Sequence, residues 1–530
     1  MSKYLYVSTF FASLGMFQFG YQSTVLNVPQ IQVESFFKRT FLRRNMGHIS
    51  STHTNLLFSV ATSLTLAGGI IGALCSGWIG NKCGRRNGLI YLQLVVLSAA
   101  SLGGMCNVLD SFEVLFISRF LAGFASGVFT SLVNLYVSEI APINLRGAAS
   151  TSCNLSCSIG ALIAMVLGLK DILGSADKWQ YVLFFPGIPA ILQLAFMPLM
   201  PESPRYLLVN KRDVDGAMKS LMILRGVTNV DKEIHEMLAE TQKEGNKEPH
   251  VQMESSEDDL LENHLSVFQV IKNSKYWLAL FVCICMQLSS QATGVVALIF
   301  YSTKFFQEAG ISCTLSSWAS VSIGGIFVVV TILSVVLMER LGRRTLHVYI
   351  GLGGMLVSSV VMNFSLIEES YKETKNATHV YCSSTSVDVD DGMEEISIYG
   401  ILVVTSSLAC VTLFAMGPGS IPWFITSEIF DEAPRAAATS ITMFCNWTFQ
   451  IAVALIFPQF QSLLGSYSFL PFLTVLSLTW IILLFYLPET KNQSSSKMAR
   501  LFQQPNSWYK PIGFQGSRLL MELDDNETVI

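Results

Sequence analysis

Residues 138–147 read SEIAPINLRG, and a second stretch, residues 427–436, reads SEIFDEAPRA. In both, a glutamate is followed seven residues later by an arginine, which gives the pairs Glu139–Arg146 and Glu428–Arg435. The copies are 289 residues apart (428 minus 139). Such self-similarity at long range predicts that one structural unit occurs twice in the chain.

Two further motifs are repeated in the same order. The sequence PES at 201–203 returns as PET at 488–490, and GRR at 84–86 returns at 342–344. The GRR copies are 258 apart (342 minus 84), and the shorter spacing is explained if residues 367–398 are an insertion in the second half. Three ordered motifs indicate an internal duplication.

The hydropathy predicts a membrane protein. The 530 residues are 51% hydrophobic and only 14% charged, against about 25% charged in soluble domains. Each apolar run of about twenty residues is long enough to cross a bilayer as a helix. The runs lie at 4–26, 55–79, 88–108, 114–137, 147–168, 180–200, 277–301, 314–338, 346–366, 399–426, 437–460 and 466–487.

This pattern predicts an all-α membrane protein with twelve transmembrane helices in two six-helix bundles. The domains expected are an N-terminal bundle at 1–200, a cytoplasmic linker with short helices at 201–275, a C-terminal bundle at 276–490 containing an extracellular insertion at 367–398, and a cytoplasmic tail at 491–530. Parallel repeats are typical of transporters that bind substrate near the bilayer midplane. We therefore expect a transporter and not an enzyme.

The orientation follows from the basic residues in the short loops. Placing both termini in the cytoplasm puts most basic loops inside and the acidic insertion outside; the basic segment Lys38–Arg44 disagrees. Asn376-Ala377-Thr378 predicts a glycosylation site, although an unused sequon explains it equally well. Cys313 and Cys382 would both lie outside, and the sequence leaves their pairing open.

Several functions lack their motifs. The 11 cysteines and 7 histidines show no metal-ligand spacing, so no metal or cofactor is expected. The net charge of −4 gives no sign of a nucleic-acid partner. No phosphate-binding Gly-x4-Gly-Lys loop is present, so ATP-driven pumping has no support.

Charged residues gather at the cytoplasmic helix ends, where carboxylates and guanidinium groups can pair across the seam between the halves. Several partly wet pairs can form a breakable inner gate. The alternative is that they serve only topology and capping. The expected gating residues are Arg85, Glu139, Arg146, Glu339, Arg343, Arg344, Glu428 and Arg435.

Two kinds of residue mark the candidate substrate site. Gly417, Pro418, Gly419 and Pro422 cannot continue an ideal helix, so the tenth helix is expected to hinge there; a static kink is the alternative. Amides at i,i+4 spacing share one helix face, and aromatic planes stand beside them. Interhelical bonding is the alternative for each amide. The polar and aromatic candidates are Gln18, Gln22, Asn154, Gln287, Ser290, Gln291, Asn446, Gln450, Trp423 and Trp447.

Taken together, these motifs resemble the sugar porters of the major facilitator superfamily, and most closely the animal facilitative hexose transporters, over residues 10–492. The motifs that carry the resemblance are Gly84-Arg85-Arg86, Glu139 to Arg146-Gly147, Pro201-Glu202-Ser203-Pro204-Arg205, Glu339 to Arg344, Gly417 to Trp423 and Pro488-Glu489-Thr490-Lys491. The resemblance implies a plasma-membrane uniporter for a hexose, with glucose as the expected sugar.

The resemblance also marks site residues. Gln291, Trp423 and Asn446 match the family's sugar-contacting positions, and Asn154 stands where glutamine is common. Departures from the family pattern occur at four positions that usually carry polar side chains, namely Ser290, Val296, Phe327 and Ala415. They leave two alternatives open: a sugar receptor that transports poorly, and a carrier for a less polar solute.

Coupling and partners complete the expectations. Proton-coupled sugar symporters carry Asp in the context Phe-Gly-Tyr-Asp, whereas this chain has Gln22 there and leaves Arg119 without an obvious acidic partner. Glutamine does not titrate, so passive uniport is expected. The final residues Glu527-Thr528-Val529-Ile530 fit a PDZ-domain ligand weakly.

Overall fold

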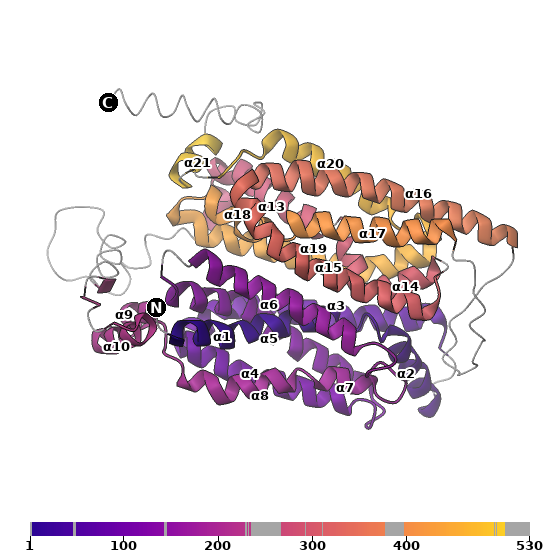
Figure 1. The fold of residues 1–530 in the computed structure, drawn as a ribbon, viewed down its shortest axis with the longest axis horizontal. Coiled ribbons are helices and arrows are strands. Elements are labelled where there is room, and N and C mark those ends of the chain that lie inside the picture. Colours follow the sequence, from indigo (N-terminus) through magenta and orange to yellow (C-terminus); the bar gives the residue numbers. More distant parts are fainter. Residues whose placement is uncertain are drawn as a thin grey trace. The chain divides into compact units, whose positions relative to one another are not determined.

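A computed structural model describes the chain at residues 3–45, 49–142, 146–227, 230–231, 233–234, 267–291, 293–309, 311–376, 397–491, 493 and 495–503. Within these ranges every regular element is a helix (Figure 1). Nine described segments are long and apolar enough to cross a membrane, and two shorter apolar helices lie at Ser152–Leu167 and Leu470–Tyr486. With α1 they account for the twelve predicted segments, so the all-α expectation is confirmed.

The first half contains ten α-helices among the described residues, and those that match predicted spans begin and end within a few residues of them. Their bounds are α1 Lys3–Thr24, α2 Gln30–Arg43, α3 Ser51–Cys83, α4 Arg85–Met105, α5 Phe112–Ile140, α6 Arg146–Leu167, α7 Trp179–Phe184, α8 Gly187–Phe196, α9 Pro204–Val209 and α10 Val214–Arg225. The sixth predicted span is divided between α7 and α8 at Pro186.

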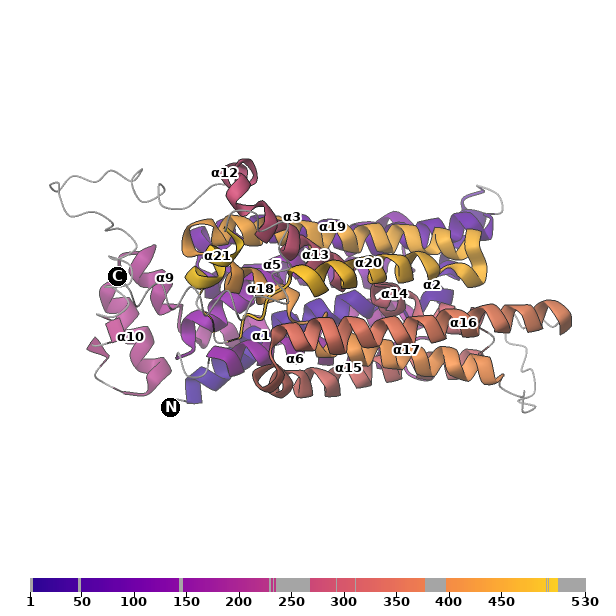
Figure 2. The ribbon, with the colours of Figure 1, turned by 90° about the horizontal axis from the view of Figure 1, so that it is seen from above.

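The second half begins after the linker. Its α-helices are α12 Val267–Lys272, α13 Trp277–Gln291, α14 Val295–Glu308, α15 Cys313–Leu341, α16 Gly353–Asn376, α17 Ile398–Met416, α18 Pro422–Ile429, α19 Glu432–Leu464, α20 Leu470–Tyr486 and α21 Ser495–Phe502. A π-helical segment, Thr345–Leu352, precedes α16. Figure 2 gives the view turned by 90°.

The chain divides into two compact units. Unit 1 contains residues 1–25, 64–164 and 177–264, and unit 2 contains 26–63, 165–176 and 265–530. The helices α3 and α6 therefore contribute residues to both units. The domain boundaries expected from the sequence stay a prediction.

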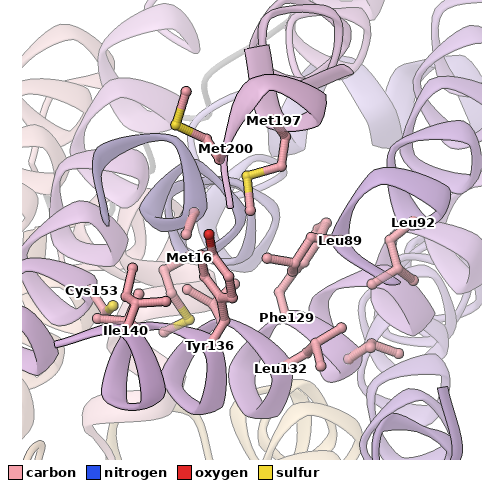
Figure 3. Packing of buried hydrophobic residues seen from close by; sticks show 14 of the residues in the cluster. Met16, Leu89, Leu92, Phe129, Leu132, Tyr136, Ile140, Cys153, Met197 and Met200 are labelled. Atoms are coloured by element: carbon pink, nitrogen blue, oxygen red, sulfur yellow. The ribbon is translucent and has the colours of Figure 1, made fainter. Parts of the chain in front are cut away.

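The core of unit 1 lies where α1, α4, α5 and α8 pack together. Figure 3 shows Met16, Leu89, Phe129 and Tyr136 converging there, and all four are buried. Tyr136 keeps its hydroxyl bonded, because it donates to the carbonyl of Pro201 at 2.7 Å. An apolar core with one satisfied polar tip is the arrangement expected for a buried tyrosine.

In unit 2, α13 packs against α19 and α20, and α17 packs against α15 and α16. The span predicted at 277–301 lies within one apolar segment, Ser274–Gln307, that is long enough to cross a membrane, but its helix is interrupted: α13 ends at Gln291 and α14 begins at Val295. Gly294 occupies the break with φ of +87°, a conformation that favours glycine. A Cβ there would also lie 3.2 Å from the ring of Phe469, a tight contact that adds to the preference of the backbone for glycine.

Candidate functional site

The amides predicted on α13 and α19 meet in unit 2. Asn446 Nδ2 donates to Gln287 Oε1 at 2.7 Å, and Gln287 Nε2 donates to the carbonyl of Pro422 at 2.9 Å. Gln287 and Asn446 are almost completely buried. The bond to Pro422 ties α13 to the first residue of α18, directly beside the predicted hinge. These two amides therefore brace the site by interhelical bonding, and the Asn446 carbonyl oxygen is left for another partner.

The last turn of α13 holds polar groups at the helix break. Gln291 Nε2 donates to Ser290 Oγ at 3.1 Å, and Ser290 Oγ donates to the Gln287 carbonyl at 3.0 Å. Gln291 Oε1 and Thr293 Oγ1 are buried without a partner among the described residues. A buried acceptor without a bond costs about 1–3 kcal/mol, which a hydroxylated ligand or a water can recover.

Aromatic and apolar side chains of unit 2 stand beside these amides in the sequence. Trp423, on α18, is 36% exposed, whereas Trp447, on α19, is buried. Phe327 of α15 stacks on Phe414 of α17, with ring centroids 6.3 Å apart and an interplanar angle of 26°. Ala415, which follows Phe414, is also buried. Phe327, Phe414 and Ala415 therefore offer apolar surface and no hydrogen-bonding side chain.

The chain breaks between α17 and α18. Residues 417–421 form turns, in which the amide of Gly419 bonds the carbonyl of Phe414 at 2.8 Å. Pro422 is the first residue of α18, where its missing N–H costs little. Pro418 lies against the π-helical segment, since a Cβ on Gly351 would come within 2.5 Å of the proline ring. The structure therefore confirms that the helix is interrupted at the predicted residues.

In unit 1 the buried Arg119 bonds the amide of Gln22 and not a carboxylate. Arg119 Nη1 donates to Gln22 Oε1 at 2.5 Å, and Arg119 Nη2 donates to the carbonyl of Gln22 at 2.8 Å. Both side chains are buried. The arginine thus receives two neutral acceptors, and Gln22 is occupied by it. Asn154, by contrast, is exposed within its unit.

Gln18 belongs to a different network in unit 1. Its Nε2 donates to Gln93 Oε1 at 3.0 Å, and Gln93 Nε2 donates to Gln193 Oε1 at 2.7 Å. This chain of amides joins α1, α4 and α8 inside the core. The structure therefore places Gln18 in interhelical bonding, which was the alternative for each of these amides.

The repeated GRR and PE(S/T) motifs form the same cap twice. In unit 1, Glu202 Oε1 accepts the first two backbone amides of α4 at 3.1 and 2.9 Å; in unit 2, Glu489 accepts the amides of the two arginines after Gly342 at 2.8 and 3.1 Å. Carboxylates stabilise helix N-termini in this way. Gly84 and Gly342 have φ of +96° and +90°, and a Cβ on either would meet the capping carboxylate at 2.5 Å.

The first copy of the gating cluster is a buried ion pair in unit 1. Arg85 Nε and Nη2 donate to the two oxygens of Glu139, each at 3.1 Å, and the Ser203 hydroxyl donates to the same carboxylate. The two charged side chains are only 9% and 7% exposed. This fork-to-fork geometry is the stronger form of an arginine–carboxylate bond.

The second copy lies in unit 2 and is looser. Arg343 Nε and Nη2 both reach Glu428 Oε1 at 3.3 Å, and Thr490 Oγ1 donates to the other oxygen at 2.5 Å. These charged side chains are 22% and 25% exposed. In both copies the carboxylate partner belongs to the arginine's own unit, and pairing across the two halves stays a prediction.

The remaining predicted residues are placed as follows. Arg435 Nε donates to the carbonyl of Phe430 at 3.3 Å, and Arg344 Nη2 donates to that of Leu484 at 3.0 Å. The side chains of Arg146, Glu339, Asn376 and Cys313, together with Cys382 and the last residues 527–530, lie outside the described part of the chain.

Sequence reasoning quoted Glu202 and Glu489 as motif residues but missed their capping role. The repetition was itself the available signal, because a GRR motif and a PE(S/T) motif that occur together in both halves imply one shared contact. It also missed His347, which is buried in the π-helical segment with Nε2 3.1 Å from Ser289 Oγ. No pattern in the sequence indicated the π-helix.

Comparison with known proteins gives one consistent result. The family model described as "Sugar (and other) transporter" matches residues 8–502. Solute carrier family 2, facilitated glucose transporter member 3 from Mus musculus is 35% identical over 95% of this chain and 94% of its own length. The Homo sapiens protein of that name is 34% identical over 93% of this chain and 91% of its own.

Solved structures share the fold. The partially occluded inward-open conformation of the xylose transporter XylE from E. coli superimposes with a TM-score of 0.71 at 20% identity, covering 93% of this chain and all of that one. The proton:xylose symporter XylE bound to 6-bromo-6-deoxy-D-glucose gives 0.68 at 21% identity, covering 94% and 99%. The fold is that of a major facilitator transporter.

The helices, the duplicated motifs and these likenesses define the class of protein, a multi-pass membrane transporter and not an enzyme. Within that class, the chain belongs to the sugar transporter family of the major facilitator superfamily, with the facilitated glucose transporters of solute carrier family 2 among its relatives.

Proposed function

We propose that the chain is a facilitative uniporter of a hexose, with glucose as the substrate, acting by alternating access in the plasma membrane with both termini in the cytoplasm. The observation that carries the substrate class is the last turn of α13. There, and in the break that follows, Gln291 Oε1 and Thr293 Oγ1 are buried acceptors without a partner in the part of the chain that the structure describes, beside the Gln287–Asn446 bond. A sugar hydroxyl supplies the donor that they lack.

The same proposal assigns roles to the aromatic and amide candidates. Trp423 offers a partly exposed face for the C–H patches of a ring. Gln287 and Asn446 hold α13, α18 and α19 in register. They therefore position the helices around the sugar as well as contact it. Asn154 is the polar candidate contributed by unit 1. The relatives named above as glucose transporters support glucose as the sugar.

Uniport is supported by Gln22 and Arg119. A proton-coupled carrier needs a group that gains and loses a proton near substrate, and a buried carboxylate beside an arginine can do this. Here the Arg119 guanidinium is bonded to an amide oxygen and a backbone carbonyl, neither of which titrates. The gradient of the sugar itself is then the driving force.

The duplicated charge clusters are proposed as the inner gate. Each cluster fastens the start of one helix to the end of another within its unit, through Glu202 or Glu489 and through the ion pairs Arg85–Glu139 and Arg343–Glu428. Each unit thus keeps its own helix ends together during alternating access. The break at 417–421 is proposed as the hinge that closes on substrate.

A second candidate is favoured by one specific observation. The Phe327–Phe414 stack and the buried Val296 and Ala415 replace polar positions by apolar surface. A solute with fewer hydroxyl groups than glucose would suit that surface better. A transport-poor sugar receptor is the remaining alternative, since each lost hydrogen bond costs about 1–3 kcal/mol.

Uptake of labelled glucose, fructose and 2-deoxyglucose into cells that lack hexose carriers tests the proposal. Saturable glucose flux without a proton current supports uniport, and a proton current that requires sugar overturns it. Binding without flux supports the receptor, and absence of both supports the less polar solute. The double variant Ser290→Gln/Val296→Asn is the matched comparison, because it restores two amides without altering the helix break.

A further inference from the structure

A second polar cluster of unit 2 lies away from the candidate site. It is formed by α2, by the first turns of α3 and by α14, and in Figures 1 and 2 the helices α2 and α14 lie at the end of unit 2 opposite α21. The sequence assigns this end to the outside of the membrane. None of the gating residues predicted from the sequence belongs to it.

Lys304 of α14 is the centre of the cluster. Its Nζ donates to Glu34 Oε1 of α2 at 3.0 Å and to Asn55 Oδ1 of α3 at 2.7 Å. The lysine and glutamate side chains are 20% and 16% exposed, so the charges are largely shielded from water. Gln30 Nε2 donates to the same Glu34 oxygen at 2.8 Å and holds it toward the lysine. One ammonium group therefore joins three helices.

The charges of residues 26–63 make the Glu34 carboxylate essential to this contact. In the sequence, Glu34 is the only acidic residue between positions 26 and 63, whereas that stretch contains Lys38, Arg39, Arg43 and Arg44. Lys304 is thus a cation placed against a basic segment. Without the Glu34 carboxylate, the lysine would lose its counter-charge and keep only the side-chain oxygen of Asn55 as its acceptor.

A neutral contact lies beside the charged one. Asn27 Nδ2 donates to the carbonyl of Ile299 at 2.7 Å and to Ser302 Oγ at 2.9 Å, and it is buried. Deeper still, the ring of Phe58 lies 5.9 Å from that of Tyr301. The polar contacts and the rings together fasten segment 26–63 onto α14.

Segment 26–63 continues at both ends into helices of unit 1, because α1 ends at Thr24 and α3 passes on at Leu64. We infer that Lys304, Glu34 and Asn55 form an outer latch, a charged contact that holds this segment on α14 when the outer mouth is closed and breaks when it opens. This inference rests on the proposed alternating access. It makes the latch a positioning device that sets the fraction of molecules open to the outside.

The test measures access from outside and does not require transport. Thr62 lies seven residues beyond Asn55 on α3, two helical turns along the same face and about 10 Å deeper, and it is buried. In a Thr62→Cys background, labelling by a membrane-impermeant thiol reagent reports opening of the outer mouth. The parent chain with its native cysteines gives the background rate.

Lys304→Met and Glu34→Gln are each expected to raise the labelling rate about tenfold, which corresponds to about 1.4 kcal/mol. The swap Lys304→Glu/Glu34→Lys should return the rate most of the way to that of Thr62→Cys alone. The swap is chemically feasible because Gln30 Oε1 is a buried acceptor without a partner beside position 34. Lys275→Met, a substitution of an exposed lysine outside the latch, is the control and should leave the rate unchanged.

Unchanged labelling in both single variants overturns the latch, and so does a swap variant that labels as fast as the singles. If a single variant does not reach the membrane, Asn55→Ala removes one bond only and should give an intermediate rise of about threefold. A chain that moves no hexose but shows this labelling pattern keeps the latch and overturns the proposed function. The two failures are therefore distinguishable.

Discussion

The two copies of the gating cluster predict unequal losses of stability from the same substitution. Glu139→Gln removes the charge from a carboxylate that meets Arg85 through both oxygens at 3.1 Å, with the side chains 9% and 7% exposed. The arginine then stays buried without a counter-charge, and breaking a buried pair costs about 3–5 kcal/mol. Because glutamine keeps one acceptor, we expect about 3 kcal/mol.

The matched substitution Glu428→Gln should cost much less. Arg343 reaches only one oxygen of Glu428, at 3.3 Å, and the side chains are 22% and 25% exposed. Water can solvate the arginine when the charge is lost, so we expect about 1 kcal/mol. The difference of about 2 kcal/mol corresponds to a melting temperature about 4–8 °C lower for Glu139→Gln, using the shift typical of domains of 150–250 residues.

Thermal unfolding of the purified protein in detergent measures both shifts. Lys219→Gln, on the exposed face of α10, is the control and should change stability by less than about 0.5 kcal/mol. The double variant Arg85→Gln/Glu139→Gln should recover about half of the loss, because no buried charge is then left alone. Equal shifts at Glu139 and Glu428 would show that burial does not set the strength of these pairs, and a double variant worse than the single would exclude the isolated charge as the cause.

Three further outcomes are expected. Gly84→Ala should lower the melting temperature by several degrees, because a φ of +96° costs an L-residue about 1–2 kcal/mol and the new Cβ would meet Glu202. Gly77→Ala, where a Cβ has open space, is the control. Gln287→Leu leaves Asn446 Nδ2 without its acceptor, so hexose uptake should fall about tenfold or more, and uptake equal to the parent would argue against the brace. Gln22→Asp should make uptake depend on pH where the parent shows a flat profile, and a flat profile in the variant would show that a carboxylate beside Arg119 is not enough to couple protons.

Much of the fold could be predicted because membrane segments follow from composition and length. Runs of apolar residues must become helices in lipid, where each backbone polar group needs an internal partner. The glycines and prolines at 417–422 marked one break for the same reason. The break at Gly294 was missed because a single glycine is common in transmembrane helices, and its φ of +87° is known only from the structure.

The candidate site was predicted less completely. Gln287 and Gln291 share one helix face by their spacing. Gln287, however, bonds Asn446 and Pro422, whereas Gln291 Oε1 has no partner among the described residues. Spacing alone could not separate these roles, since both are glutamines on α13. Gln18 and Gln22 also differ in role: Gln18 belongs to the chain of amides in the core, and Gln22 bonds Arg119.

Residue order alone was enough to predict the helical membrane fold, the repeated motifs and the family, because hydropathy and motifs are properties of order along the chain. Which groups meet depends on the folded chain. It gave Glu202 and Glu489 their helix caps, made Arg85–Glu139 tighter than its copy, and placed Lys304 between Glu34 and Asn55. Such contacts depend on distances between helices far apart in the sequence, and hydrogen bonds and ion pairs weaken sharply when those distances change.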